Sequence, residues 1–261
     1  MKITKILVIV SAIIFLISCS KDTENVNDGN YKKLDIAQNS TIVCFGNSLT
    51  QGWGARGGFY PVDTSKAYPH YLAQKVNIPV INLGISGETS QDALSRVDEV
   101  LSYNPAIIFI EFGANDLFEQ MEKVTSGGNI NLSFVEDDVE KNFEEMLERL
   151  VNDNRQIYLV KFYNREIAQE LLKGEIEVWG EIYKYDYMFI YSDYENMFAR
   201  LKTKYRATLI SNIWDGIWGK DHLMYDGDNI MIHPNADGYR IMADNYFKTV
   251  KGFLEFNDLL L

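Results

Sequence analysis

The sequence predicts an α/β domain in which a parallel β-sheet is covered by helices on both faces. Two observations lead to this class. Five short runs are rich in Val, Ile and aromatic residues and are almost continuously apolar, which is typical of strands buried on both faces of a sheet. Segments with helical periodicity separate these runs, and a helix between two strands allows the strands to lie parallel.

The predicted elements alternate along the chain. The strands are TIVCF (41–45), PVINL (79–83), AIIFIEF (106–112), QIYLVKF (156–162) and ATLI (207–210). The helices cover residues 68–76, 89–101, 133–152, 193–204 and 235–251. Ser133 followed by Glu136 predicts a capping box at the start of the third helix. The length of 261 residues favours one domain or two small ones, and we expect one doubly wound domain.

Residues 1–18 predict a secretory signal peptide. Lys2 and Lys5 precede an apolar run from Ile6 to Ile17 that is short for a membrane span, so a transmembrane anchor is the weaker alternative. The residues LISC that end this run are similar to the bacterial lipobox, in which the cysteine is lipidated and becomes the new N-terminus. We therefore expect a lipoprotein. Acyl chains such as palmitate on Cys19 would hold it at a membrane outside the cytoplasm.

The segment after the lipidated cysteine is polar and aperiodic. Residues 19–40 are expected to form the lipidated N-terminus and a flexible tether, and residues 41–261 the domain. Ser20 follows Cys19 where an aspartate would favour the inner membrane, so the outer membrane or cell surface is the expected location. The other cysteine, Cys44, lies in an apolar run and is expected to be a buried strand residue.

The charge of the chain excludes some classes of partner. Removal of the signal peptide takes away two lysines and no acidic residue, which changes the net charge from −12 to −14. Nucleic acids and anionic lipid headgroups bind to clustered Lys and Arg, so neither is an expected partner. The sequence contains no metal-ligand spacing of the His-Glu-x-x-His type, and we expect no metal, no cofactor and no obligate protein partner.

Polar residues and glycines follow the predicted strands. Residues 46–52 (GNSLTQG) come after the first strand, 84–90 (GISGETS) after the second and 113–116 (GAND) after the third. The stretch 232–239 (IHPNADGY) comes after the fifth. Ligands of doubly wound sheets bind beyond the carboxyl ends of the strands, so these four segments are expected to meet along one edge of the sheet.

The four segments, read as FGNSLTQG, NLGISGETS, FGANDL and IHPNADGY, resemble the signature blocks of the GDSL, or SGNH, hydrolase family, in the family's order and over about residues 40–251. The resemblance implies a three-layer α/β/α, flavodoxin-like domain with a five-stranded parallel sheet. It also implies an esterase site carried by Ser48, Gly87, Asn115 and His233. The spelling of the middle two blocks is most similar to the arylesterase and lysophospholipase/thioesterase branch.

These residues suit ester hydrolysis. A serine hydroxyl becomes a nucleophile when an imidazole takes its proton, so Ser48 needs His233 within hydrogen-bond reach, with His222 as a reserve base. The backbone N–H groups of Ser48 and Gly87, with the Asn115 side chain, would form an oxyanion hole. We expect a serine esterase acting on a small aryl or acyl ester. The alternatives are a carbohydrate O-acetylesterase and a non-catalytic surface binding protein on the same scaffold.

Two positions depart from the family pattern. Asn47 stands where the family usually has aspartate, and its side-chain oxygen can still accept the backbone hydrogen bonds that shape the turn. The family's acid lies three residues before the histidine, and here that residue is Ile230. Asp228 is the first candidate for orienting His233 and Asp226 the second. Orientation by a backbone carbonyl is the third possibility.

Residues 164–196 form an insertion that is too long for an ordinary connection. The stretch REIAQELLKGEIEVW (165–179) predicts an amphipathic helix. The aromatic residues of the insertion are Trp179, Tyr183, Tyr185, Tyr187, Phe189, Tyr191 and Tyr194. They either pack the insertion onto the sheet or cap the cleft and supply an apolar wall for the substrate.

Overall fold

The computed structural model describes residues 31–57, 62–125, 131, 133–178, 181–186, 188–227 and 232–261. For residues 124, 125 and 171 and for the described residues between 173 and 186, only the backbone is described. Residues 31–261 form one unit. The predicted signal peptide and Cys19 lie outside the described residues.

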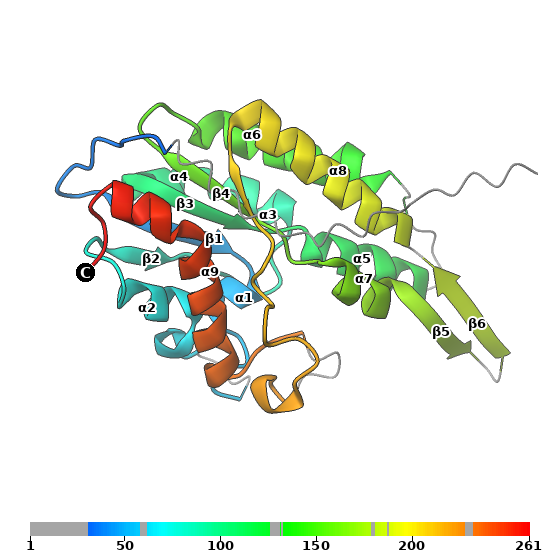
Figure 1. The fold of residues 1–261 in the computed structure, drawn as a ribbon. Helices are drawn as coiled ribbons and strands as arrows, with labels where there is room; N and C mark the ends of the chain where they lie inside the picture. Colours follow the sequence, from blue (N-terminus) through cyan, green and yellow to red (C-terminus); the bar gives the residue numbers. More distant parts are fainter. Residues whose placement is uncertain are drawn as a thin grey trace, which may run out of the picture. The chain divides into compact units, whose positions relative to one another are not determined.

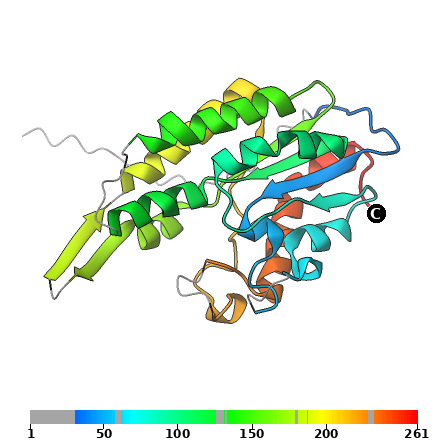
Figure 2. The same ribbon diagram turned by 180° about the vertical axis from the view of Figure 1, so that it is seen from behind.

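The five predicted strands form one parallel sheet (Figures 1 and 2). They are β1 (Thr41–Gly46), β2 (Val80–Asn82), β3 (Pro105–Glu111), β4 (Gln156–Val160) and β7 (Thr208–Ile210). Their order across the sheet is β2-β1-β3-β4-β7. This is the flavodoxin-like order, in which the second strand of the chain lies outside the first. The α/β fold class predicted from the sequence is confirmed.

Helices cover both faces of the sheet (Figures 1 and 2). On one face α2 (Tyr68–Ala73) packs against α9 (Ala236–Phe256). On the other face α3 (Ser90–Ser95), α4 (Val97–Ser102), α6 (Lys141–Leu150) and α8 (Met188–Tyr205) form a second layer. Because both faces are covered, every residue of β1 and β3 is buried, including Cys44, as expected.

Several helices differ from the sequence prediction. The single helix predicted over 89–101 is divided into α3 and α4 at Arg96, whose side chain bonds to the Leu83 carbonyl and pairs with Glu88. The sequence predicted no helix between residues 113 and 132, but residues 114–125 form α5 (Ala114–Thr125). Shorter elements are α1 (Ser48–Gln51), η1 (Thr64–Lys66) and η3 (Asp221–Leu223).

The capping box predicted at Ser133 is wrong. The Ser133 hydroxyl donates to the carboxylate of Asp137 and does not cap a backbone N–H, and the chain opens there with a π-helical turn, η2 (Val135–Glu140), before α6. A complete capping box stands instead at the start of α3, where Thr89 and Asp92 each accept the other's backbone N–H. The box therefore fixes the residues that follow the 84–88 loop.

The predicted helix 165–179 ends early. Helix α7 (Arg165–Leu172) is followed by an antiparallel hairpin of β5 (Lys173–Val178) and β6 (Glu181–Asp186). The sequence EIEV in β5 alternates apolar and acidic residues, and this period of two fits a strand better than a helix. In both ribbon views the hairpin extends beyond α7 and away from the five-stranded sheet (Figures 1 and 2).

The described part of the predicted tether is packed on the domain. Leu34 is buried, and its backbone N–H donates to the Asn257 side chain at 2.7 Å. Tyr31 stacks edge-on against Phe253 of α9. Lys33 pairs with Asp258 beyond the end of that helix. The folded unit thus begins at Tyr31, ten residues before β1.

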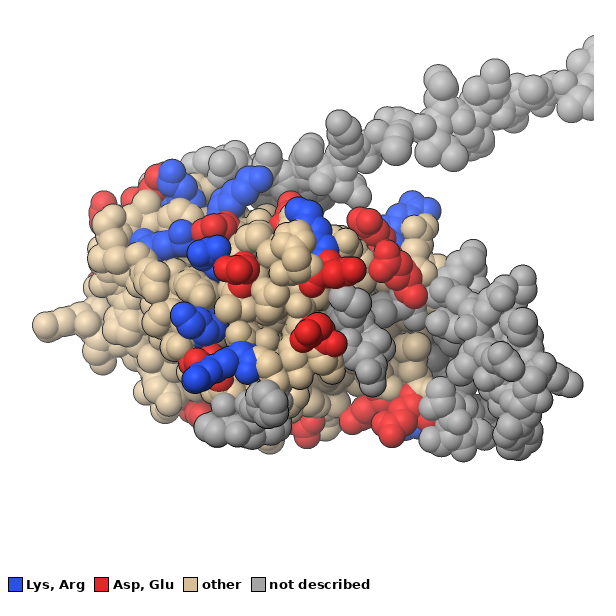
Figure 3. Space-filling model, turned by 90° about the horizontal axis from the view of Figure 1, so that it is seen from below, with Lys and Arg blue, Asp and Glu red and all other residues tan. Residues whose placement is uncertain are grey.

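Charges of both signs are interspersed on the face of the molecule shown in Figure 3. Many acidic residues have a basic partner nearby, as in the pairs of Arg200 with Glu140 and of Lys204 with Glu144, which join α8 to the helices beneath it. Within the described residues, no helix combines the length and the apolar character needed to cross a bilayer.

Candidate active site

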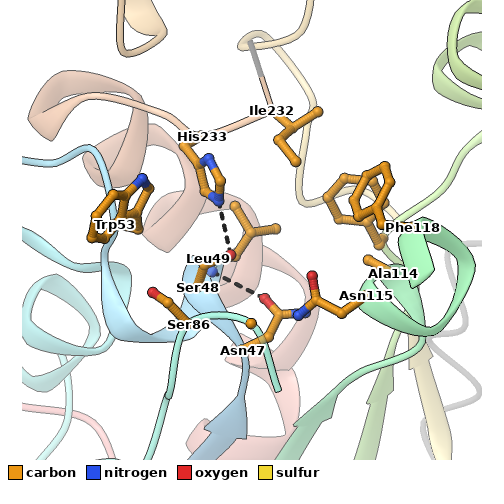
Figure 4. Close-up of a pocket in the computed structure, with 12 residues that line it drawn as sticks. Asn47, Ser48, Leu49, Trp53, Ser86, Ala114, Asn115, Phe118, Ile232 and His233 are labelled. Carbon is orange, nitrogen blue, oxygen red and sulfur yellow. Dashed lines mark hydrogen bonds between the residues drawn. The ribbon is translucent and has the colours of Figure 1, made fainter. Parts of the chain in front are cut away.

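Ser48 lies at the carboxyl end of β1, in a sharp turn that starts α1. The Asn47 side chain accepts the backbone N–H of Leu49 at 3.1 Å and thereby caps this helix (Figure 4). Asn47 is buried, whereas Ser48 is half-buried and lines a pocket. The expectation that an asparagine can shape this turn in place of an aspartate is confirmed.

His233 faces Ser48 across this pocket. Its Nε2 lies 2.8 Å from the Ser48 hydroxyl oxygen (Figure 4). The segment that carries it is fixed by the Asn235 side chain, whose oxygen caps α9 and whose nitrogen donates to the carbonyls of His222 and Met224. The structure therefore brings together two residues that are 185 positions apart in the sequence.

The predicted oxyanion residues line the same pocket. Gly87 lies on the loop after β2 and has a φ of 87°, in the left-handed region that favours glycine. Asn115 lies in the first turn of α5, and its Nδ2 donates to the Glu88 carbonyl at 2.8 Å. A side-chain amide has two N–H donors, so this bond ties Asn115 to the Gly87 loop and uses one of them.

The loops that carry Gly87 and Asn115 are held by residues that the sequence analysis did not single out. The Gln51 side chain of α1 accepts both the N–H and the hydroxyl of Ser86. Asp116 accepts the N–H and hydroxyl of Ser90, and burial raises the pKa of its carboxyl. These bonds join the first three strand-end segments to one another.

Tyr194 of α8 also belongs to this support. Its hydroxyl donates to the Gly113 carbonyl at 2.7 Å, directly before α5. Among the aromatics predicted to wall the cleft, Tyr194 is thus buried behind the site, and Phe189 is 40% exposed. Trp179 and Tyr187, and the side chains of Tyr183 and Tyr185, lie outside the described part of the structure.

The apolar lining of the pocket comes from other elements. It includes Trp53, Phe118 of α5, Phe162 after β4 and Ile232. Phe118 and Ile232 lie on the opposite side of Ser48 from Trp53 (Figure 4). None of the described lining residues comes from the insertion 164–196.

Of the two candidates for the acid that orients His233, the structure describes only Asp226. Asp226 is exposed to solvent. Asp228 lies outside the described residues. His222, the reserve base, is also exposed and contributes its backbone carbonyl to the Asn235 bond. In the part of the chain that is described, no group of three or more His, Cys, Asp or Glu side chains is arranged to hold a metal ion.

A buried carboxyl beneath the turn was also missed. Glu111 ends β3 and is 0% exposed, and its Oε2 accepts the Thr50 hydroxyl at 3.1 Å. The signal in the sequence was a single glutamate in the otherwise apolar run AIIFIEF. A glutamate is almost never fully buried unless its carboxyl has a partner, so a glutamate in an apolar strand indicates a specific contact.

A flavodoxin-like domain with a serine and a histidine in contact at the strand ends is the architecture of a serine ester hydrolase. The chain belongs to the GDSL-like lipase/acylhydrolase family, whose model matches residues 44–241.

The chain is similar to several relatives and solved structures at low sequence identity. The chain is 25% identical over 209 residues to thioesterase 1/protease 1/lysophospholipase L1 of Escherichia coli, covering 78% of this chain and 80% of that protein. It is 25% identical over 241 residues to an acetylxylan esterase of Geobacillus stearothermophilus, covering 83% and 96%. A crystal structure of the esterase EstA from Pseudoalteromonas superposes with a TM-score of 0.58 at 22% identity, covering 83% and 99%, which shows the shared fold.

A shorter match concerns the predicted lipoprotein. The chain is 37% identical over 78 residues to the uncharacterized lipoprotein YqeF of Bacillus subtilis. This match covers 29% of this chain and 31% of that protein.

Substitution of the two loop glycines should have unequal effects. A Cβ on Gly84 would lie 2.1 Å from the backbone nitrogen of Gln51, so Gly84→Ala forces α1 and the 84–88 loop apart and should lower the free energy of unfolding by about 3 kcal/mol or more. A Cβ on Gly87 meets no atom within 4 Å, so Gly87→Ala should cost only the positive φ, about 1–2 kcal/mol. Urea unfolding measures both, and an equal or reversed ranking would contradict this packing.

Proposed function

We propose that the protein hydrolyses carboxylic esters through a covalent acyl-enzyme formed on Ser48. The observation that supports this proposal is the 2.8 Å contact between His233 Nε2 and the Ser48 hydroxyl at the wall of a pocket. His233 takes the hydroxyl proton as the oxygen attacks the ester carbonyl, and it then gives that proton to the departing alkoxide. Water, activated by the same imidazole, releases the acid and restores Ser48.

The charge that develops on the carbonyl oxygen needs donors already in place. We assign this role to the backbone N–H groups of Ser48 and Gly87 and to Asn115 Nδ2. The bond from Asn115 to the Glu88 carbonyl supports this assignment because it fixes the amide beside the Gly87 loop and leaves its second N–H for the substrate.

The pocket favours an acyl or aryl ester. Its apolar side chains give a hydrocarbon group a surface to bury, and the E. coli relative is a thioesterase and lysophospholipase by name. A carbohydrate O-acetylesterase is the second candidate, supported by the acetylxylan esterase relative and by Trp53, whose ring could stack on a sugar. The Ser48 to His233 contact speaks against a non-catalytic binding protein.

We further propose that the protein is a lipoprotein held through acylated Cys19 at the outer membrane or cell surface. The lipobox-like residues 16–19 and the similarity to a lipoprotein of B. subtilis support this assignment. Incorporation of labelled palmitate into the wild type and not into Cys19→Ala would test it.

The nucleophile assignment is tested by p-nitrophenyl ester hydrolysis with the purified full-length protein. Ser48→Ala should lower kcat on the order of 10³-fold or more, and Asn115→Ala about 10²- to 10³-fold, because one removes the attacking oxygen and the other an oxyanion donor. Ser95→Ala, at an exposed serine of α3, is the matched control and should keep wild-type turnover. Full activity in Ser48→Ala would refute the mechanism.

Loss of the residue that orients His233 should reduce turnover more than substrate binding. We expect Asp228→Asn to lower kcat by orders of magnitude with KM nearly constant, and Asp226→Asn, at an exposed position, to have a small effect. Steady-state kinetics of the two variants decide between them. The opposite ranking would assign the role to Asp226, and two small effects would assign it to a backbone carbonyl.

Chain-length dependence tests the substrate class. If the pocket buries an acyl chain, kcat/KM should rise from acetate to hexanoate esters by about fourfold per methylene, equivalent to about 0.8 kcal/mol each. Phe118→Ala should flatten this rise, and Phe189→Ala, an exposed aromatic of the insertion, should not. A wild type that prefers acetate would favour the O-acetylesterase, and a flattened rise in Phe189→Ala would return the wall to the insertion.

A further inference from the structure

Glu111 is placed beside the nucleophile turn by the register of the sheet. Glu111 of β3 is paired with Gly46 of β1, and Gly46 comes two positions before Ser48. Glu111 therefore lies near Ser48 although the two are 63 positions apart in the sequence. A Cβ on Gly46 would come within 2.9 Å of Glu111 Oε2, which shows that the carboxyl packs directly against the backbone of β1. This close packing is possible because Gly46 has no side chain.

The carboxyl binds both sides of the turn. Its Oε2 accepts the backbone N–H of Asn47 at 3.4 Å and the hydroxyl of Thr50 at 3.1 Å. Asn47 precedes Ser48, and Thr50 follows it within α1. One oxygen atom therefore links the two ends of the short segment that carries the nucleophile and its backbone N–H.

The other carboxyl oxygen, Oε1, is buried and has no hydrogen-bond partner among the described residues. A carboxylate in this position would leave an unsolvated charge in the core, whereas a neutral acid would not. Burial raises the pKa of Glu111 to about 8, against the opposing effect of its hydrogen bonds to Thr50 and Asn47. At neutral pH the group is therefore mainly the uncharged acid.

The phenols and the thiol around Glu111 do not change protonation near pH 8. Tyr68 of α2, Tyr246 of α9 and Tyr163 after β4 interact with its charge, and burial raises the pKa of each phenol well above its usual 10. Burial raises the pKa of Cys44 in β1 to about 12. Burial also raises the pKa of the Asp116 carboxyl in α5, which accepts hydrogen bonds from Ser90.

We propose that Glu111 is a positioning residue for Ser48: its buried carboxyl clamps Asn47 and Thr50 and so fixes the direction of the nucleophile and of the Ser48 N–H. The clamp does not touch the substrate. This inference rests on the proposed esterase function, since it assigns a partner to that nucleophile.

Ionisation strengthens the bonds from Asn47 and Thr50 to Oε2, but it also places charge on the buried Oε1, which has no partner among the described residues, and so should disturb the turn. The folded-state pKa is higher than the usual 4.5, so the stabilising contribution is complete below pH 4.5 and is lost as the pH rises through about 8. Above that pH the charged oxygen without a partner favours rehydration of the turn. Turnover of the wild type should therefore decline through pH 8 to 9, while KM changes little.

The experiment measures kcat and KM with p-nitrophenyl butyrate between pH 6 and 9.5, corrected for spontaneous hydrolysis, for the full-length protein and three variants. Glu111→Gln keeps an acceptor for Asn47 and Thr50 and cannot ionise. Glu111→Leu removes the acceptor at similar volume. Glu140→Gln is the matched control, because Glu140 is also buried but pairs with Arg200 between η2 and α8.

Glu111→Gln should keep near wild-type kcat at pH 7 and lose the decline above pH 8. Glu111→Leu should lower kcat about 10- to 100-fold with KM within about twofold, the effect of a misdirected nucleophile. Glu140→Gln should shift only the unfolding midpoint. If Glu111→Leu does not fold, the pH profile of Glu111→Gln decides alone.

The proposal is overturned if Glu111→Leu keeps wild-type kcat and loses only stability, or if the decline above pH 8 persists in Glu111→Gln. Failure of the esterase function itself would be seen separately, as activity that is unchanged in Ser48→Ala.

Discussion

The pairing of β1 with β3 is the interaction on which the rest of the site depends. Both strands are buried at every position, and their register runs without interruption from Ile42 opposite Ile107 to Gly46 opposite Glu111. The helices that follow these strands, α1 and α5, carry Ser48 and Asn115 in their first turns. A slip of one residue would reverse the inward and outward faces of a strand and separate the two, so the apolar core also sets the geometry of the site.

The described site consists largely of neutral polar groups in a chain of net charge −12. The pocket is lined by Asn47, Ser48, Ser86 and Asn115 together with aromatic side chains. The acidic side chains nearby are turned into the supporting layer, as in the pair of Glu88 with Arg96 and the bonds of Asp116 to Ser90. No carboxylate is therefore among the described residues that line the pocket.

The sequence predicted the strands of the sheet and the loops that meet at its edge, because short stretches of residues indicate both. The five apolar runs predicted the sheet, and the glycine and asparagine spellings after them predicted which loops meet. The hairpin after Leu172, the break at Arg96 and the support from Glu111 and Tyr194 were missed. The bond of Glu111 to Thr50 spans 61 positions and that of Tyr194 to Gly113 spans 81, and no local pattern encodes such contacts. The lone glutamate in an apolar strand pointed to the first of these contacts, and the alternation EIEV pointed to the hairpin.

Residues 31–34 pack at the C-terminal end of α9, the end that is far from His233. These residues are held by Phe253 and Asn257 at the end of α9, whereas Asn235 caps its beginning, next to His233. The helix has 21 residues, which corresponds to a length of about 30 Å. Residues 31–34 and the Ser48–His233 pair thus lie near opposite ends of one rigid helix, so these two parts of the domain are kept apart by about that length.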